Sequence, residues 1–282
     1  MSAHFNLTPG SDNYCVMGNP IAHSKSPQIH AAFARQTGQH IAYAAVLVPV
    51  DGFVEAVASF QRLGGKGANV TLPFKHEAWQ LCSQRSARAE LTGAVNTLWF
   101  SEAGEVCGDN TDGVGLVRDF TTNLGGRLDG RGVLLLGAGG AARGVLPALL
   151  AAAPRRIVIA NRTVKRAEDL AAEFQRLGKV MGMGFENLGG MAFEVIINAT
   201  SASLQGSVPP LPPGVLRQGG WCYDLMYANQ PTAFMQWGSE HGADRAVDGL
   251  GMLVEQAAES FYLWRGIRPE TAPVIAALRR GE

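Results

Sequence analysis

A glycine-rich turn between an apolar strand and an apolar helix is the feature that most restricts how this chain can fold. Val133–Leu136 is a continuous apolar run, which predicts a strand buried on both faces of a sheet. The sequence GAGGAA follows at residues 137–142, and an apolar helical segment then runs to Ala153. In this context the G-x-G-x-x-A pattern predicts a dinucleotide-binding turn, whose backbone N–H groups approach a pyrophosphate at the helix N-terminus. An ordinary strand–helix turn is the alternative, because 35 glycines make chance matches common.

Strands and helices alternate from this turn onward, which predicts an α/β fold with a parallel sheet and right-handed crossovers. At 282 residues the chain is also long for one hydrophobic core, so we expect two domains. The expected strands are Val133–Leu136, Ile157–Ala160, Val180–Met183, Val195–Asn198 and Trp221–Leu225.

The end of the second of these strands indicates which dinucleotide binds. An NAD site usually carries an acidic residue about twenty positions beyond the glycine turn, where it holds the ribose hydroxyls. Here the sequence reads Asn161-Arg162-Thr163, followed by Lys165 and Arg166. Cations at the start of a helix are unfavourable without an anion, so the extra phosphate of NADP explains them better than an exposed basic helix start does.

Composition argues against several other classes of protein. The 24 basic and 24 acidic residues balance, which disfavours a nucleic-acid or membrane-surface partner. The first residues lack the basic lead and apolar core of a signal peptide, and residues 1–12 should form a polar extension, so we expect a cytoplasmic protein. No metal site is predicted, because Gln80 stands where an HExxH motif beginning at His76 needs its second histidine. Four scattered cysteines predict buried thiols rather than disulfides: Cys15, Cys82, Cys107 and Cys222.

Two serines near the N-terminus are candidates for a binding site. Ser24 and Ser26 follow the expected strand Tyr14–Gly18, and Pro27 suits the first position of a helix. Ser26 fits a helix N-cap as well as it fits a site, whereas capping does not explain Ser24.

A polar strand edge around residue 70 is a second candidate. In an extended strand Asn69 and Thr71 lie on one side, which leaves Val70 and Leu72 for the core. The strand should then break into a helix that Lys75 opens, although the macrodipole disfavours a cation there. An exposed lysine is the alternative, but a misplaced charge beside a polar strand edge favours a site.

Two more polar positions are ambiguous from the residues alone. Asp112 begins an expected helix, where a carboxylate suits the macrodipole and Asp109 or Thr111 would serve as the cap, so a structural role is favoured. Gln256 lies on a long apolar helix, where it fits solvent as well as a site.

Five short motifs follow one another along the chain: GNPIAHSKSP at 18–27, GANVTLPFK at 67–75, GAVNT at 93–97, GDNTDG at 108–113 and DGLGML at 248–253. Together they resemble the motifs of the shikimate dehydrogenase family, and the likeness runs from about Tyr14 to the C-terminus.

The resemblance implies an enzyme that uses NADPH to reduce 3-dehydroshikimate, reversibly, to shikimate in aromatic amino-acid synthesis. It also implies two domains around a cleft. Residues 1–112 with 249–282 would form a substrate-binding and catalytic domain, and residues 113–248 a Rossmann-like NADP-binding domain. The expected partner is a small-molecule substrate, and both a monomer and a homodimer stay open.

The resemblance assigns roles residue by residue. Lys75 and Asp112 are implied as the catalytic pair, which replaces the structural interpretation of Asp112. An ammonium at Lys75 can protonate the developing alkoxide while the carboxylate orients it. The implied substrate residues are Ser24, Ser26, Asn69, Thr71, Asn96, Tyr227 and Gln256, and the implied cofactor residues are Gly137, Gly139, Gly140, Ala141, Asn161, Arg162, Thr163, Arg166 and Gly249.

Two departures from the family pattern leave alternatives open. Lys165 adds a cation to the expected phosphate cluster, and residues 228–230 after Tyr227 lack an expected glycine. One alternative is an enzyme that also acts on quinate, although the two serines with Thr71 favour shikimate. The other is a non-catalytic NADP-binding sensor, which retention of the Lys75 and Asp112 pair argues against.

Overall fold

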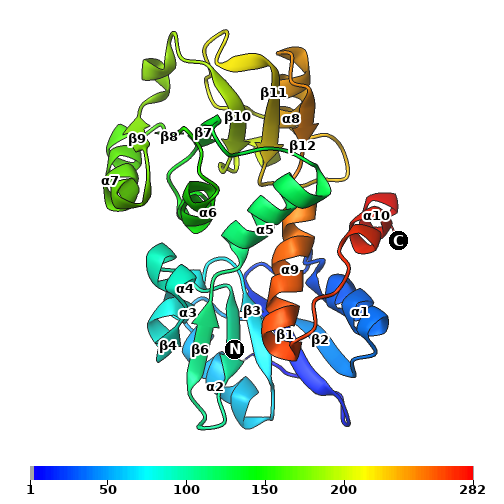
Figure 1. The fold of residues 1–282 in the computed structure, drawn as a ribbon. Coiled ribbons are helices and arrows are strands. Elements are labelled where there is room, and N and C mark those ends of the chain that lie inside the picture. The colour runs from blue at the N-terminus through cyan, green and yellow to red at the C-terminus, as the bar shows by residue number, and fades with distance from the viewer. Residues whose placement is uncertain (1–2, 282) are drawn as a thin grey trace. The chain divides into compact units, whose positions relative to one another are not determined.

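The computed structural model describes residues 3–281 and contains two compact α/β units, each built around one six-stranded sheet (Figure 1). Unit 1 comprises Met1–Asp112 and Val254–Glu282, and unit 2 comprises Gly113–Leu253. The second division falls inside helix α9 (Leu250–Arg265), whereas the sequence placed the boundary at 248/249. The predicted two-domain α/β fold is confirmed.

Unit 1 has a mixed sheet with the strand order β2-β1-β3-β5-β6-β4. Its first three strands are parallel, whereas the central hairpin that was predicted from the sequence is antiparallel to its neighbour. The strands are β1 (Asp12–Gly18), β2 (Ile41–Leu47), β3 (Gly67–Val70), β4 (Gln84–Arg85), β5 (Thr97–Phe100) and β6 (Val106–Asp109), and the other helices are α1 (Ser26–Thr37), α2 (Phe53–Arg62), α3 (Lys75–Leu81), α4 (Ala87–Thr92) and α10 (Ala272–Arg280).

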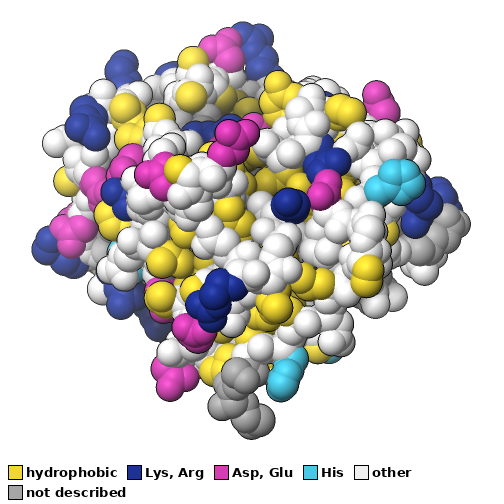
Figure 2. All heavy atoms as spheres, turned by 90° about the horizontal axis from the view of Figure 1, so that it is seen from below, with side chains coloured by type: hydrophobic (Ala, Val, Ile, Leu, Met, Phe, Trp, Pro, Cys, Tyr) yellow, Lys and Arg dark blue, Asp and Glu magenta, His cyan; other side chains and the backbone are white. Residues whose placement is uncertain are grey.

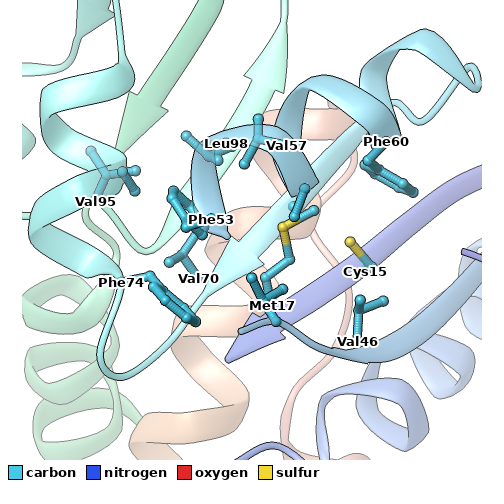
Figure 3. Close-up of a cluster of buried hydrophobic side chains, with 14 of the residues drawn as sticks. Cys15, Met17, Val46, Phe53, Val57, Phe60, Val70, Phe74, Val95 and Leu98 are labelled. Atoms are coloured by element: carbon cyan, nitrogen blue, oxygen red, sulfur yellow. The ribbon is translucent and has the colours of Figure 1, made fainter. Parts of the chain in front are cut away.

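A continuous hydrophobic core lies between this sheet and α2. Cys15 and Met17 point to the same side of β1 because side chains alternate along a strand. They meet Phe53, Val57 and Phe60, which lie on one face of α2 (Figure 3). Burying each such aromatic side chain stabilises the fold by roughly 1.5–3 kcal/mol, so this core holds the strands that carry polar residues at their ends.

The N-terminal segment extends the same core. Phe5 packs on Phe60 with ring centroids 5.1 Å apart, and Leu7 also packs against the core cluster. The backbone N–H of Thr8 donates to Asn13 Oδ1 at 2.8 Å. The prediction of a polar extension is therefore wrong for its described residues, because two apolar side chains anchor the segment. Residues 1–2 lie outside the described part.

Two local predictions in unit 1 are wrong. Helix α1 begins at Ser26 itself, with Lys25 in the N-cap position, because the Ser24 hydroxyl accepts from the Ser26 N–H at 3.3 Å and turns the chain one residue early. Ser26 is thus a buried helical residue and not the N-cap. Leu72 is 71% exposed rather than in the core, because β3 ends at Val70 and the alternation of side chains ends with it.

Unit 2 contains the predicted parallel sheet, with the strand order β12-β11-β10-β7-β8-β9. The strands are β7 (Gly132–Leu136), β8 (Arg156–Ala160), β9 (Val180–Met183), β10 (Phe193–Asn198), β11 (Leu216–Asp224) and β12 (Arg245–Val247), and the helices are α5 (Asp112–Arg118) with a π-helical turn (Asp119–Asn123), α6 (Gly140–Ala151), α7 (Val164–Phe174) and α8 (Ala233–Glu240), with short 3₁₀ turns at Gln175–Leu177, Phe185–Leu188 and Ala202–Gln205.

The strand order of unit 2 fixes where a ligand would bind. From β7 the chain first builds outward through β8 and β9, and then returns to the other side of β7 to add β10. Ligands of such sheets bind beyond the carboxyl ends of the strands at this switch point. The glycine turn after Leu136 therefore lies where a dinucleotide is expected.

The surface adds little to this assignment. On the face shown in Figure 2, basic and acidic side chains are interspersed rather than gathered by sign. Within residues 3–281, no helix is both long enough and apolar enough to span a bilayer.

Candidate active site

Lys75 and Asp112 form an ion pair in unit 1. Lys75 Nζ lies 2.5 Å from Asp112 Oδ2, and the two side chains are 27% and 13% exposed. Lys75 is the first residue of α3 and Asp112 the first of α5, so two helix starts place the charges together. The ion pair cannot be predicted by considering each residue by itself, because Lys75 and Asp112 are far apart in the sequence.

Asn96 holds the other oxygen of the carboxylate. Its Nδ2 lies 2.8 Å from Asp112 Oδ1 and 3.0 Å from Thr111 Oγ1, and its Oδ1 accepts from the Thr111 N–H at 2.9 Å. Asn96 is 2% exposed. Because both oxygens of Asp112 have hydrogen-bond partners, the carboxylate is fixed in orientation.

An ion pair between the part-exposed Arg88 and the buried Asp109 supports the segment that carries Asp112. Arg88 and Ser86 both donate to the carboxylate of Asp109. Burial acts to raise the pKa of Asp109, but these hydrogen bonds and the Arg88 charge outweigh it and hold the pKa below its usual value. The amide oxygen of Asn110 accepts from the Asp112 N–H at 3.1 Å and supports the start of α5.

Four further polar residues complete what we call the unit 1 network. Asn69 Nδ2 donates to the Asn96 carbonyl oxygen at 3.1 Å and to Ser260 Oγ at 3.0 Å. Gln256 Oε1 lies 3.3 Å from Asn96 Nδ2, so this glutamine faces the network and not open solvent. The network comprises Lys75, Asp112, Asn96, Thr111, Asn69, Thr97, Gln256 and Ser260.

The remaining expected substrate residues are placed separately. Thr71 follows β3 and is half-buried, and a Cβ at Gly18 would lie 2.4 Å from its methyl group, which explains the glycine. Ser24 is half-buried and contacts the start of α1 through its hydroxyl. Tyr227 belongs to unit 2, where burial raises the pKa of its phenol.

The glycine turn of unit 2 has the shape that a pyrophosphate needs. Gly137 has a φ of +101°, and a Cβ there would lie 3.1 Å from the Thr200 methyl group. Gly139 and Gly140 are exposed, and a Cβ at either would meet nothing within 4 Å. Helix α6 starts at Gly140 without a side-chain cap, so its first N–H groups are available to an anion. These residues fit NADP.

The basic residues after β8 differ from one another. Arg162 and Arg166 are exposed and, within residues 3–281, form no ion pair. Lys165 pairs with Asp169 on the same helix, so it is already neutralised. Asn161 Nδ2 donates to the Thr163 carbonyl oxygen at 2.9 Å and shapes the turn that presents Arg162. The exposed arginines fit the extra phosphate of NADP better than Lys165 does.

Two other positions at the strand ends need a different explanation. A Cβ at Gly249 would lie 2.4 Å from the Leu225 carbonyl oxygen, so close backbone packing requires that glycine. The loop after β10 is held by Asn198, whose Oδ1 accepts from the Thr200 N–H at 3.1 Å and whose Nδ2 donates to the buried Asp224. Sequence reasoning missed Asn198 and Asp224, although their place at the carboxyl ends of parallel strands was a signal.

A Rossmann-like unit with an open glycine turn, in a chain whose other unit carries a part-buried lysine–aspartate pair, defines an α/β oxidoreductase that uses a dinucleotide. Family models match three segments: the substrate-binding domain of shikimate dehydrogenase over residues 16–98, shikimate/quinate 5-dehydrogenase over 120–205, and the C-terminal domain of shikimate 5-dehydrogenase over 249–279.

Similar proteins extend this match to nearly the whole chain. A shikimate dehydrogenase (NADP(+)) of Alkalilimnicola ehrlichii is 61% identical over 269 residues, which cover 95% of this chain and 99% of that protein. An Ael1 enzyme from Pseudomonas putida has a TM-score of 0.89 at 46% identity, covering 95% and 98% of the two chains. The shikimate 5-dehydrogenase of Thermus thermophilus, solved with NADP(H) and shikimate, has a TM-score of 0.85 at 32% identity, covering 96% and 99%. The chain belongs to the shikimate dehydrogenase family.

Proposed function

We propose that this chain catalyses the NADP-dependent, reversible reduction of 3-dehydroshikimate to shikimate, a step of aromatic amino-acid synthesis. The observation that carries the proposal is the Lys75–Asp112 pair at 2.5 Å, whose second carboxylate oxygen is held by Asn96. A chain of this family that had lost catalysis would have no need to keep this costly, partly desolvated arrangement. The geometry therefore favours the enzyme over a non-catalytic sensor.

Lys75 is the proton donor in the direction of ketone reduction. NADPH, when bound, supplies the hydride. As negative charge develops on the substrate oxygen, the ammonium of Lys75 stabilises it and transfers one proton to it, which leaves a neutral amine. Asp112 holds the ammonium in place through its Oδ2, and Asn96 prevents the carboxylate from turning away. In the direction of shikimate oxidation the same amine accepts the proton.

The other proposed substrate residues bind a small acid covered in hydroxyl groups. Ser24 and Ser26 donate to its carboxylate, while Thr71, Asn96 and Gln256 bind its hydroxyls. Asn69 and Tyr227 belong to the same proposed set. Hydroxyl and amide groups select such a substrate, because an analogue without a matching hydroxyl leaves a buried polar group unpaired.

Unit 2 is the proposed NADP domain and unit 1 the substrate domain. The turn formed by Gly137, Gly139, Gly140 and Ala141 would hold the pyrophosphate through backbone N–H groups, and the 2′-phosphate would pair with the free arginines. The proposed cofactor residues after β8 are Asn161, Arg162, Thr163 and Arg166, with Gly249 as a further contact.

We place the enzyme in the cytoplasm, as a monomer or homodimer without a nucleic-acid or membrane partner. All four cysteines are buried and free, which suits a compartment where thiols stay reduced.

The test of this function is to follow NADPH absorbance with purified protein and each candidate acid. Rapid NADP reduction with shikimate and slow reduction with quinate would support the proposal. Comparable rates with both acids would favour an enzyme of broader specificity. No reduction with either acid, together with tight NADPH binding, would favour the sensor and contradict the proposal.

A further inference from the structure

The unit 1 network continues past Asn69 to a tyrosine that no motif pointed to. The hydroxyl of Tyr43, on β2, donates to Asn69 Oδ1 at 2.7 Å. Asn69 in turn lies 3.1 Å from the Asn96 carbonyl oxygen, and Asn96 reaches Asp112. An unbroken series of hydrogen bonds therefore joins β2 to the lysine–aspartate pair.

The donors of Asn69 are fully used inside the protein. Its Nδ2 carries two protons, and three acceptors lie within 3.2 Å of it: the Asn96 carbonyl oxygen, Thr97 Oγ1 and Ser260 Oγ. Its Oδ1 accepts the Tyr43 proton and keeps one lone pair. Asn69 can therefore meet a substrate only as an acceptor, and only while Tyr43 fixes its amide.

The ring of Tyr43 is itself held in place. It stacks on His30 of α1 with centroids 4.2 Å apart and planes 8° from parallel. His30 lies one helical turn after Ser26, whose side chain lies near the phenol and acts to lower its pKa. Burial of the hydroxyl end raises the Tyr43 pKa well above its ordinary value, so the phenol keeps the proton that it donates.

We infer that Tyr43 is a positioning residue for the substrate, which acts by holding Asn69, beside Ser26, in the orientation that a substrate hydroxyl requires. The inference rests on the proposed function. Removing the phenol hydroxyl leaves Asn69 Oδ1 buried without its donor, so the amide tilts or binds water instead. The loss falls on substrate binding, because neither Lys75 nor the cofactor residues contact Tyr43.

Replacing Tyr43 by Phe tests this directly, and Tyr14→Phe is a matched control. Tyr14 is another tyrosine of the unit 1 sheet; it is buried and stacks on Trp264, and its hydroxyl accepts from Arg265 at 3.3 Å, outside the unit 1 network. We expect Tyr43→Phe to raise the KM for shikimate by roughly 5–10-fold, with the kcat and the KM for NADP within about 2-fold of wild type, as loss of one neutral hydrogen bond implies. Tyr14→Phe should leave all three constants within about 2-fold.

A second variant, Asn69→Ala, distinguishes a loss of substrate positioning from a general loss of folded protein. Asn69→Ala removes the group through which Tyr43 acts, so adding Tyr43→Phe to it should change the shikimate KM little further, whereas Tyr14→Phe should behave alike in both backgrounds. An unchanged shikimate KM in Tyr43→Phe, or equal rises in both Michaelis constants, would overturn the inference while leaving the proposed function intact. A wild-type protein that does not oxidise shikimate with NADP would instead overturn the proposed function.

Discussion

The unit 1 network, which we propose binds the substrate, and the two turns of unit 2 that we propose bind the cofactor are built in opposite ways. In the network, side chains from strands and helices far apart in the sequence form hydrogen bonds with one another. Asn96 itself makes three such contacts, with Asp112, Thr111 and Gln256. In the cofactor turns, exposed backbone N–H groups and unpaired arginines belong to two short local segments. The residues of the first region act as a coupled unit, whereas those of the second make separate contacts. The effects of substitutions should therefore be non-additive within the first region and additive in free energy between the two regions.

The largest effect should follow from Lys75→Ala. The substitution removes an interaction that strengthens as charge develops on the substrate oxygen, so kcat should fall roughly 10²–10⁴-fold. The KM for shikimate should change far less, because hydroxyls and amides elsewhere hold the ground state. Lys75→Arg should not restore kcat, since a guanidinium keeps its proton. Steady-state kinetics on folded protein measure this, and a near-normal kcat would show that the Lys75–Asp112 pair is structural rather than catalytic.

Arg162→Ala should have the next largest effect, and on a different constant. Loss of one charge-assisted contact to the 2′-phosphate should raise the KM for NADPH roughly 10–100-fold and leave that for NADH nearly unchanged. Lys165→Ala is the matched control, because Lys165 is already paired with Asp169 and should change the KM less than about 3-fold. Equal losses for both cofactors would mean that Arg162 does not bind the phosphate.

Ser24→Ala and Ser26→Ala should each weaken shikimate binding by roughly 5–30-fold, as expected for one neutral hydrogen bond to a carboxylate. Binding of NADPH, measured in the same calorimetric series, should stay unchanged. Because Ser26 is not the N-cap of α1, its substitution should not lower the melting temperature by the amount that loss of a cap implies. Unchanged shikimate affinity with a lower melting temperature would show a purely structural role.

His30→Phe should alter how the stability of the protein depends on pH. His30 is fully buried, and burial lowers its pKa from 6.5 to about 3, a shift that nearby Asn69 only partly opposes. Between these pH values the unfolded chain binds one proton more than the folded chain does, so this residue makes stability fall as pH drops below 6.5, by up to about 1.4 kcal/mol per pH unit. Above that pH its effect is absent. Urea unfolding of both proteins from pH 7 to 4 should show a shallower slope for the variant, and parallel slopes would contradict the assignment.

The contrast between the two regions also explains what the sequence could predict. The turn at residues 137–142 and the basic segment at 161–166 are local, so strand, glycine and helix signals were enough to find them. The chemistry of unit 1 was not readable residue by residue: Asp112 looked like an ordinary helix start, because its partners Lys75 and Asn96 come from other elements. Only the resemblance to a family joined them.

The errors in the sequence analysis have related causes. Leu72 was assigned to the core by extending strand alternation past the end of β3, and Ser26 was assigned as the cap one residue too late. Arg88 and Tyr43 were missed because each acts through a partner, Asp109 or Asn69, that only the folded chain brings near. Local sequence patterns predict individual helices and strands, but contacts between side chains of different elements become visible only in the tertiary structure.

The most direct test of the account is a pair of double-mutant cycles on kcat/KM. Lys75→Ala combined with Asp112→Asn should lose much less than the product of the two single losses, because the two residues act as one unit. Lys75→Ala combined with Arg162→Ala should lose the full product, because those residues share no partner. Multiplicative losses within the Lys75–Asp112 pair, or strong coupling of Lys75 to Arg162, would contradict the claim that the substrate network works as a unit separate from the cofactor contacts.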